Sequence, residues 1–130
     1  GDPIVLKVLC RSRIHRADAM LAVARRVLAG FAEPVHSNPD DAMLEISAVG
    51  VSKASALERL TAGLGIAAQD VVAFGDMPND VAMLRWAGRG YAMADGHPEA
   101  VAAANEVAPP CAEDGVAQVL EGLLGVSGSR

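Results

Sequence analysis

The chain has 130 residues, of which 52% are hydrophobic and 21% are charged, and its formal net charge is -5. This length suits one domain or parts of two, and the apolar share is large enough to bury a core, which excludes a disordered chain. The acidic balance argues against binding to nucleic acid or to an anionic membrane surface. No apolar run approaches the ~20 residues of a membrane-spanning helix, so we expect no membrane partner.

The two cysteines, Cys10 and Cys111, have no CxxC or CxH partner in the sequence. We expect both to be reduced and to pack as small hydrophobic residues in a cytoplasmic protein.

The first third of the chain predicts a strand, a helix and two further extended pieces. Residues 4–9 form a β-branched apolar run, which is typical of a strand. A helix is expected from Ala17, and its apolar face would carry Met20, Ala24, Val27 and Phe31. Gly30 and Pro34 follow as ordinary stop signals. Residues 35–37 and 43–48 then predict the two extended pieces.

The remainder of the chain alternates helices with short strands. Ser52 stands where an N-cap belongs, before a helix whose buried face would carry Leu57, Leu60 and Leu64. Apolar runs at 71–74, 90–94 and 106–108 predict three strands, each followed by a helical pattern. The fold class expected from this order is α/β, with a parallel sheet and right-handed crossovers in a Rossmann-like layer structure.

Near residues 48–51 the order of predicted elements changes from strand-helix-strand-strand to alternating helices and strands. This change predicts a domain boundary. It separates a small α/β piece, residues 1–48, from the layered piece, residues 49–125. The Gly- and Ser-rich end, residues 126–130, is expected to be a flexible tail.

Polar residues follow the strand expected at 71–74. Asp76 comes directly after Gly75, and Asn79 and Asp80 lie on the turn that opens the next helix. In open α/β sheets, ligands bind at the carboxyl ends of the strands. Oxygen ligands without Cys or His suit Mg²⁺ better than zinc, although the same residues are also common helix caps. A metal site and a capped turn therefore both remain open.

Lys53 is the second candidate site residue, because it stands at the start of the preceding helix. A lysine at a helix N-terminus suits a phosphate, although a solvated surface lysine is the common alternative. The histidines show no metal-ligand spacing. His15 and His36 are expected to be surface or cap residues, and His97, before Pro98, is expected to cap or pack.

Several segments in series carry a resemblance to a known family. They are G-V-S-K at 50–53, F-G-D-M-P-N-D at 74–80, A-G-R-G-Y-A-M at 87–93, H-P-E at 97–99 and E-D-G-V-A at 113–117. Together they resemble the C-terminal half of haloacid dehalogenase (HAD) superfamily phosphatases of the Cof-like branch. The resemblance implies a partial HAD core at residues 49–125, preceded by part of the α/β cap domain of that branch.

The resemblance also implies a Mg²⁺-dependent phosphohydrolase acting on a small phosphorylated metabolite. In this family an aspartate attacks phosphorus, and a second aspartate two residues later protonates the leaving group. Asp76 would then be the Mg²⁺ ligand, and Lys53 would pair with the nucleophile and the phosphoryl oxygens. Asn79 would contact the phosphate or a metal-bound water, and Asp80 would steady the loop or the metal shell.

The sequence departs from the family pattern at the nucleophile. No two aspartates are separated by a single residue, so the D-x-D-G-[ST] motif is absent. We therefore expect a fragment that is inactive by itself. The strand missing from the family pattern would lie beside residues 71–74, so a homo-oligomer or an N-terminal segment is expected to cover the exposed sheet edge.

Two other function classes compete with this hypothesis. A non-catalytic structural or binding module that retains the HAD fold would also explain the missing motif. A nucleotide-binding Rossmann domain has weak support, because no G-x-G-x-x-G follows a strand.

Overall fold

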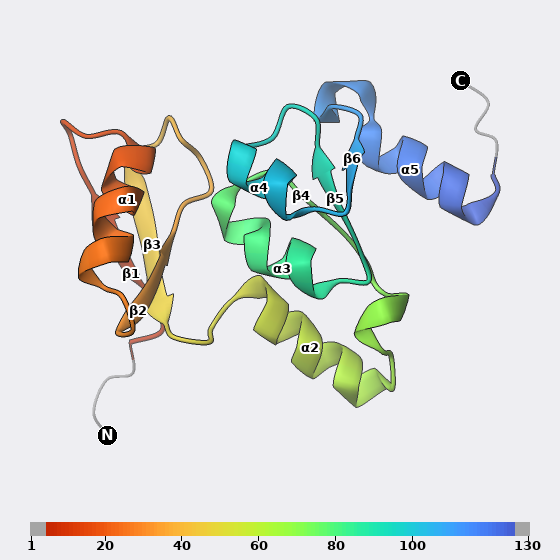
Figure 1. Cartoon of the computed structure of the whole chain (residues 1–130), viewed down its shortest axis with the longest axis horizontal. Coiled ribbons are helices and arrows are strands. Elements are labelled where there is room, and N and C mark those ends of the chain that lie inside the picture. The colour runs from red at the N-terminus through yellow and green to blue at the C-terminus, as the bar shows by residue number, and fades with distance from the viewer. Residues whose placement is uncertain (1–4, 127–130) are drawn as a thin grey trace.

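The computed structural model describes residues 5–126, which form two parts (Figure 1). We call residues 5–48 the N-terminal part and residues 53–126 the C-terminal part, and the short segment 49–52 joins them. No helix among the described residues is both long and apolar enough to cross a bilayer.

The N-terminal part is a three-stranded antiparallel sheet with one helix. Its elements are β1 (Val8–Arg11), α1 (Ala17–Val27), β2 (Ala32–Val35) and β3 (Met43–Ala48). The strand order is β1-β3-β2, and Cys10 pairs with Leu44 in the β1–β3 register. Helix α1 packs on β2 and β3, and Leu21 and Leu44 are both 2% exposed. The small α/β piece predicted from the sequence therefore has the expected order of elements.

Several local predictions in this part are wrong in detail. The first strand begins at Val8 rather than at residue 4, which lies outside the described residues. The second strand comes earlier than expected and contains Pro34, which pairs with Ile46. Proline is tolerated there because β2 is an edge strand of the sheet that the described residues form. On the side of β2 that has no neighbouring strand, the missing N–H removes no hydrogen bond between strands. Phe31, expected on the helix face, is 84% exposed beyond the end of α1.

The C-terminal part is a parallel sheet covered by helices. Its elements are α2 (Lys53–Leu64), β4 (Val72–Gly75), α3 (Val81–Trp86), β5 (Arg89–Met93), α4 (Pro98–Ala103), β6 (Glu106–Ala108) and α5 (Gly115–Leu124). The strand order is β4-β5-β6, and all pairs are parallel. The predicted α/β class with a Rossmann-like parallel sheet is confirmed.

The core of this part forms on both faces of β5. Ala92 packs with Leu84 and Ala100, which come from α3 and α4. The neighbouring positions Tyr91 and Met93 pack with Ala108 on the other face, where Val116 and Val119 of α5 cover them. This alternation is the two-residue period of a strand that is buried on both faces.

Other apolar predictions did not hold. Leu60 and Leu64, expected in the buried face of α2, are 59% and 64% exposed, because α2 packs on α3 through another side. Both cysteines are exposed rather than packed as hydrophobic residues. β4 is an edge strand of the sheet that the described residues form, and Val72 on it is 37% exposed.

Candidate functional site

The loop after β4 is built around Asp80. Strand β4 ends at Gly75, and a 3₁₀ turn, Pro78–Asp80, leads into α3. The Oδ2 atom of Asp80 accepts hydrogen bonds from the backbone N–H groups of Asp76 and Met77, at 3.0 and 3.2 Å. Asp80 is only 5% exposed, so these bonds form away from water and fix the path of the loop.

Lys53 reaches the same aspartate from the start of α2. Its Nζ donates to Oδ1 of Asp80 at 2.5 Å, and the two side chains are 50% and 7% exposed. Ser52 caps α2 as predicted, in a reciprocal capping box with Ser55. Asp80 thus has both carboxylate oxygens engaged by protein groups, and these contacts fit loop support better than direct metal ligation.

Close packing explains the glycine before Asp76. A Cβ on Gly75 would lie 2.5 Å from the Cβ of Asp80, which is too close for any side chain. Gly96, from the loop after β5, lies against the backbone of Asp76, and the N–H of His97 donates to the Asp76 carbonyl at 2.6 Å. Asp76 therefore lies between two loops at the carboxyl ends of β4 and β5.

Asp76 stands in a negative electrostatic environment. Burial raises the pKa of its carboxyl above the ordinary value, and the nearby charges of Asp80 and Asp95 raise the pKa further. Lys53 acts in the opposite direction, but its effect is smaller. Carboxylates brought together in this way repel one another unless a cation lies between them. Carboxylate oxygens are the ligands that Mg²⁺ prefers, and a cation would relieve the repulsion among these carboxylates. The arrangement therefore fits a Mg²⁺ ion held by Asp76.

Asp95 is a further candidate residue near Asp76 that was not predicted from the sequence. It follows β5 much as Asp76 follows β4, and these two strands are neighbours in a parallel sheet. The sequence contained the signal, because polar residues after adjacent parallel strands meet at one edge.

Asn79 lies where the two parts of the chain meet. Its backbone N–H donates to the carbonyl of His36 at 3.2 Å. Asn79 and Lys53 both line a cavity of about 310 Å³, and Lys7, Glu45 and Ser47 line the same cavity from the N-terminal part. The structure therefore brings all four predicted residues to one region: Asp76 and Asp80 in the loop after β4, Lys53 at the start of α2 in contact with Asp80, and Asn79 beside the cavity.

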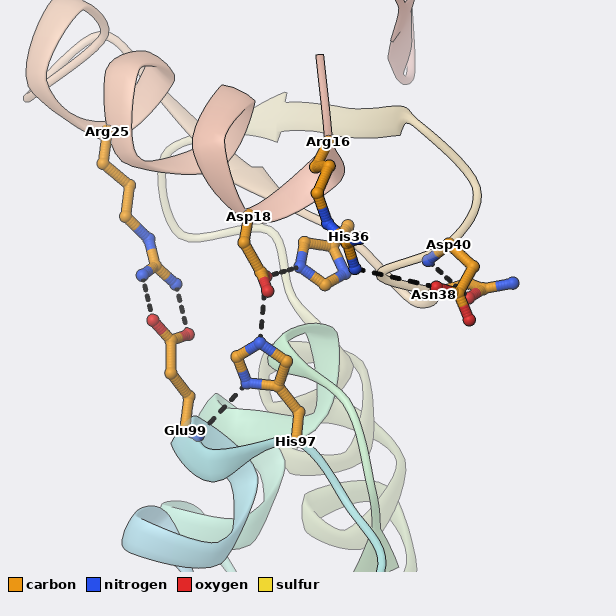
Figure 2. A network of polar contacts seen from close by, with 8 residues as sticks. All are labelled: Arg16, Asp18, Arg25, His36, Asn38, Asp40, His97 and Glu99. Carbon is orange, nitrogen blue, oxygen red and sulfur yellow. Dashed lines mark hydrogen bonds and ion pairs between the residues drawn. The ribbon is translucent and has the colours of Figure 1, made fainter.

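A second polar cluster joins the two parts (Figure 2). Asp18, in the first turn of α1, accepts hydrogen bonds from the Nε2 atoms of His36 and His97 at 2.5 and 2.9 Å. These bonds lower the pKa of the Asp18 carboxyl, the bond from His36 most strongly. Arg25 makes two further bonds to Glu99, at 2.5 and 2.9 Å.

No pattern in the sequence predicted this cluster. His36 is 0% exposed, so its prediction as a surface or cap residue is wrong. His97 does cap α4, because its side chain accepts from the N–H of Glu99, as predicted. No local spacing could reveal the cluster, because Asp18 and His97 are 79 positions apart.

Comparison with known proteins places this geometry in a family. The sequence profile of haloacid dehalogenase-like hydrolases matches residues 7–120. The chain is 36% identical over 88 residues to the 5-amino-6-(5-phospho-D-ribitylamino)uracil phosphatase YcsE of Bacillus subtilis, covering 68% of this chain and 34% of that protein. It is 40% identical over 94 residues to the HMP-PP phosphatase of an Enterobacter species, covering 72% of this chain and 31% of that protein.

A solved structure shows the same fold. A haloacid dehalogenase-like hydrolase from B. subtilis superposes with a TM-score of 0.75 at 28% identity, covering 89% of this chain and 40% of that one. The chain thus spans about a third of the length of the two phosphatases and 40% of this neighbour. The resemblance read from the sequence is confirmed, and the chain belongs to the haloacid dehalogenase-like hydrolase family.

Proposed function

We propose that this chain carries the metal and lysine half of a phosphohydrolase site that acts on small phosphorylated metabolites. The observation that carries the proposal is the arrangement at the carboxyl end of β4. There Lys53 and Asp76 are both held by Asp80, through an ion pair at 2.5 Å and a backbone bond at 3.0 Å. A cation and a metal-binding carboxylate fixed beside each other suit the charge of a phosphoryl group.

Each residue of the chain has a physical role in this proposal. The ammonium of Lys53 is a compact charge that binds phosphoryl oxygens, and its half-exposed side chain leaves donors for them. The amide of Asn79 can donate to a phosphate oxygen from the wall of the cavity. Asp80 positions both the lysine and the loop, so that neither must be ordered when substrate binds.

Mg²⁺ is the cofactor we propose for this site. Asp76 would hold it from the protein side, and Asp95 would add negative charge nearby. When bound, the ion would supply neutralisation of the phosphoryl charge. Burial is the main cause of the raised pKa of Asp76, and a cation beside this carboxyl would oppose the added effect of the Asp80 and Asp95 charges.

The substrate would place its leaving group in the cavity of about 310 Å³ beside Lys53. The N-terminal part presents Lys7, Glu45 and Ser47 to this space, and Lys7 and Glu45 pair at 2.5 Å. These polar groups can meet hydroxyl or amino groups of a substrate, and the apolar side chains of Val35 and Val51 line the same cavity. We therefore propose a phosphorylated polar metabolite, since the relatives named above are phosphatases of small phosphorylated compounds.

The nucleophile is not among the residues of this chain, because no D-x-D pair is present. We propose that an N-terminal segment bearing D-x-D supplies a strand along the open edge of β4; a second copy of the chain could cover this edge but would not supply the nucleophile. The cytoplasm is the compartment we infer, because two exposed free thiols persist best in a reducing environment.

The alternative is a non-catalytic module that keeps the fold. The missing D-x-D favours it for this chain taken alone. The negative surroundings of Asp76 favour the phosphatase, since a purely structural turn gains nothing from crowded carboxylates.

Turnover of p-nitrophenyl phosphate with Mg²⁺ separates the two. We expect no activity from this chain alone and activity after a segment bearing D-x-D from a relative is added. If no such complementation restores turnover although the complex forms, the non-catalytic alternative is favoured. Activity of the chain alone that survives Asp76→Ala would contradict the whole assignment.

A further inference from the structure

Three side chains outside the proposed phosphatase site converge between the two parts of the chain. We call Asp18, His36 and His97 the bridging cluster. Asp18 comes from α1, His36 follows β2, and His97 caps α4. One possible ligand atom from each lies within 4.8 Å of the others. Figure 2 shows both imidazole rings directed at the Asp18 carboxylate.

The burial of the cluster is uneven. The side chain of His36 is 0% exposed, and its Nδ1 atom has no hydrogen-bond partner among the described residues. The side chain of His97 is 11% exposed, whereas that of Asp18 is 53% exposed. The open side at Asp18 gives an ion a path from solvent.

The chemistry of the cluster suits one class of ion. Two imidazole nitrogens and one carboxylate oxygen are the ligand set of zinc sites with an open fourth position. Mg²⁺ and Ca²⁺ prefer oxygen alone, so the bridging cluster and the loop at Asp76 differ in the ion that they favour.

We propose that the bridging cluster binds one Zn²⁺ ion, or a divalent ion of the same preference, through Nε2 of His36, Nε2 of His97 and the carboxylate of Asp18. Water fills the fourth position on the solvent side. The ion ties α1 and the end of β2 to the N-terminus of α4, and so joins the two parts of the chain. The Arg25–Glu99 ion pair makes a second link between the same two helices.

Only a small movement is required. Tetrahedral zinc ligands at about 2.1 Å from the ion lie roughly 3.4 Å from each other. The Asp18 oxygen, now 2.5 and 2.9 Å from the two Nε2 atoms, must therefore withdraw by about 0.5–0.9 Å. Asp18 can do this by a rotamer change, since it is half exposed in the first turn of α1.

Binding of the ion changes the protonation pattern of the rings. Without it, each neutral ring carries its proton on Nε2 and donates to Asp18, and Nδ1 of His97 accepts from Glu99 N–H at 3.2 Å. With it, Nε2 supplies its lone pair to the metal, and the proton resides on Nδ1. The hydrogen bond from the Glu99 N–H to Nδ1 of His97 is then lost, because a protonated Nδ1 cannot accept it. The proton only moves within each ring, so no net proton is released.

The test uses the untagged chain, stripped of metal, with both exposed cysteines replaced by serine. Zinc titration by calorimetry should give one site per chain. Asp18→Asn, His36→Asn and His97→Asn should each weaken the affinity by about 100-fold, since loss of a ligand should cost at least as much as loss of an outer partner. Asp18→Asn changes an exposed side chain, and circular dichroism verifies that this variant is folded.

Two variants serve as matched controls. His15→Asn removes the remaining histidine, which is exposed and does not belong to the cluster, and should leave the affinity unchanged. Asp76→Asn should also leave it unchanged, which separates this site from the proposed phosphatase site.

Nitrogen-15 NMR of the imidazole rings gives the independent signature. Excess Zn²⁺ should move the proton of His36 and His97 from Nε2 to Nδ1. Three results would overturn the proposal: no zinc binding, an affinity lost equally in His15→Asn or Asp76→Asn, or rings that keep their Nε2 protons in saturating zinc. In each case the bridging cluster is a hydrogen-bonded contact only.

Discussion

Replacement of Asp80 by alanine tests whether this carboxylate organises the candidate site. Its side chain is 7% exposed and accepts two backbone N–H groups, from Asp76 and Met77. Each buried donor left unpaired costs about 1–3 kcal/mol. The ion pair with Lys53 adds at most about 1 kcal/mol, because the lysine is half exposed and regains water. Partial hydration of the opened loop offsets some of this, so we expect Asp80→Ala to lower the free energy of unfolding by about 2–4 kcal/mol.

A second variant separates hydrogen bonding from charge. In Asp80→Asn the amide oxygen can still accept the two backbone N–H groups, while the NH₂ group faces Lys53. We expect this variant to lose only about 1 kcal/mol, since the bonds to the loop survive. Asp70→Ala is the matched control, because Asp70 is an exposed aspartate before the same strand, and it should change stability by less than about 0.5 kcal/mol.

Urea unfolding followed by circular dichroism and by the fluorescence of Trp86 measures all three variants. If Asp80→Ala costs no more than Asp70→Ala, the carboxylate does not hold the loop, and the reasoning is refuted. If Asp80→Asn costs as much as Asp80→Ala, charge rather than hydrogen bonding holds the loop.

Three further predictions follow from the same structure. Gly75→Ala should lower the free energy of unfolding by about 1–3 kcal/mol, because the new Cβ would lie 2.5 Å from that of the buried aspartate; Gly63→Ala, in open space within α2, should instead stabilise the chain in the same urea assay. Asp76→Asn should stabilise the metal-free chain at pH 7. Folding raises the pKa of the Asp76 carboxyl, so the free energy of unfolding falls as the pH rises from the ordinary pKa of 3.8 through the raised pKa. The amide of the variant does not titrate, so the variant has no such loss. Equal urea midpoints for wild type and this variant at pH 7 would contradict that sign, and Mg²⁺ should stabilise the wild type alone. A double-mutant cycle of Arg25→Ala and Glu99→Ala should give a coupling of about 0.2–1 kcal/mol, since both side chains are more than a third exposed, and a zero coupling would mean that this pair does not hold the two parts together.

The fold of the C-terminal part was predictable because its signals are local. Strands of four or five residues, glycines at their ends and the Ser52 cap each act within a few positions of the chain. The loop at Asp76 was predictable for the same reason, because Asp80 closes it from four residues away. Alternation of helices and strands then leaves few possible topologies.

The contacts between the two parts could not be predicted in this way. The bridging cluster joins residues that are 18 and 79 positions apart, and no periodicity records which helix end meets which strand end. The apolar pattern of α2 correctly predicted a helix but not which of its residues are covered. Leu60 and Leu64 remain exposed because a pattern specifies an apolar face and not the element that packs on it.

The central claim is that Asp76 and Lys53 form half of a phosphatase site. The most direct test is the kcat for p-nitrophenyl phosphate in the presence of Mg²⁺, with the chain complemented by a D-x-D-bearing segment. Asp76→Ala and Lys53→Ala should each lower kcat by about 1,000-fold, while Asp70→Ala should leave it unchanged. Full activity in the Asp76→Ala or Lys53→Ala complex would contradict the account.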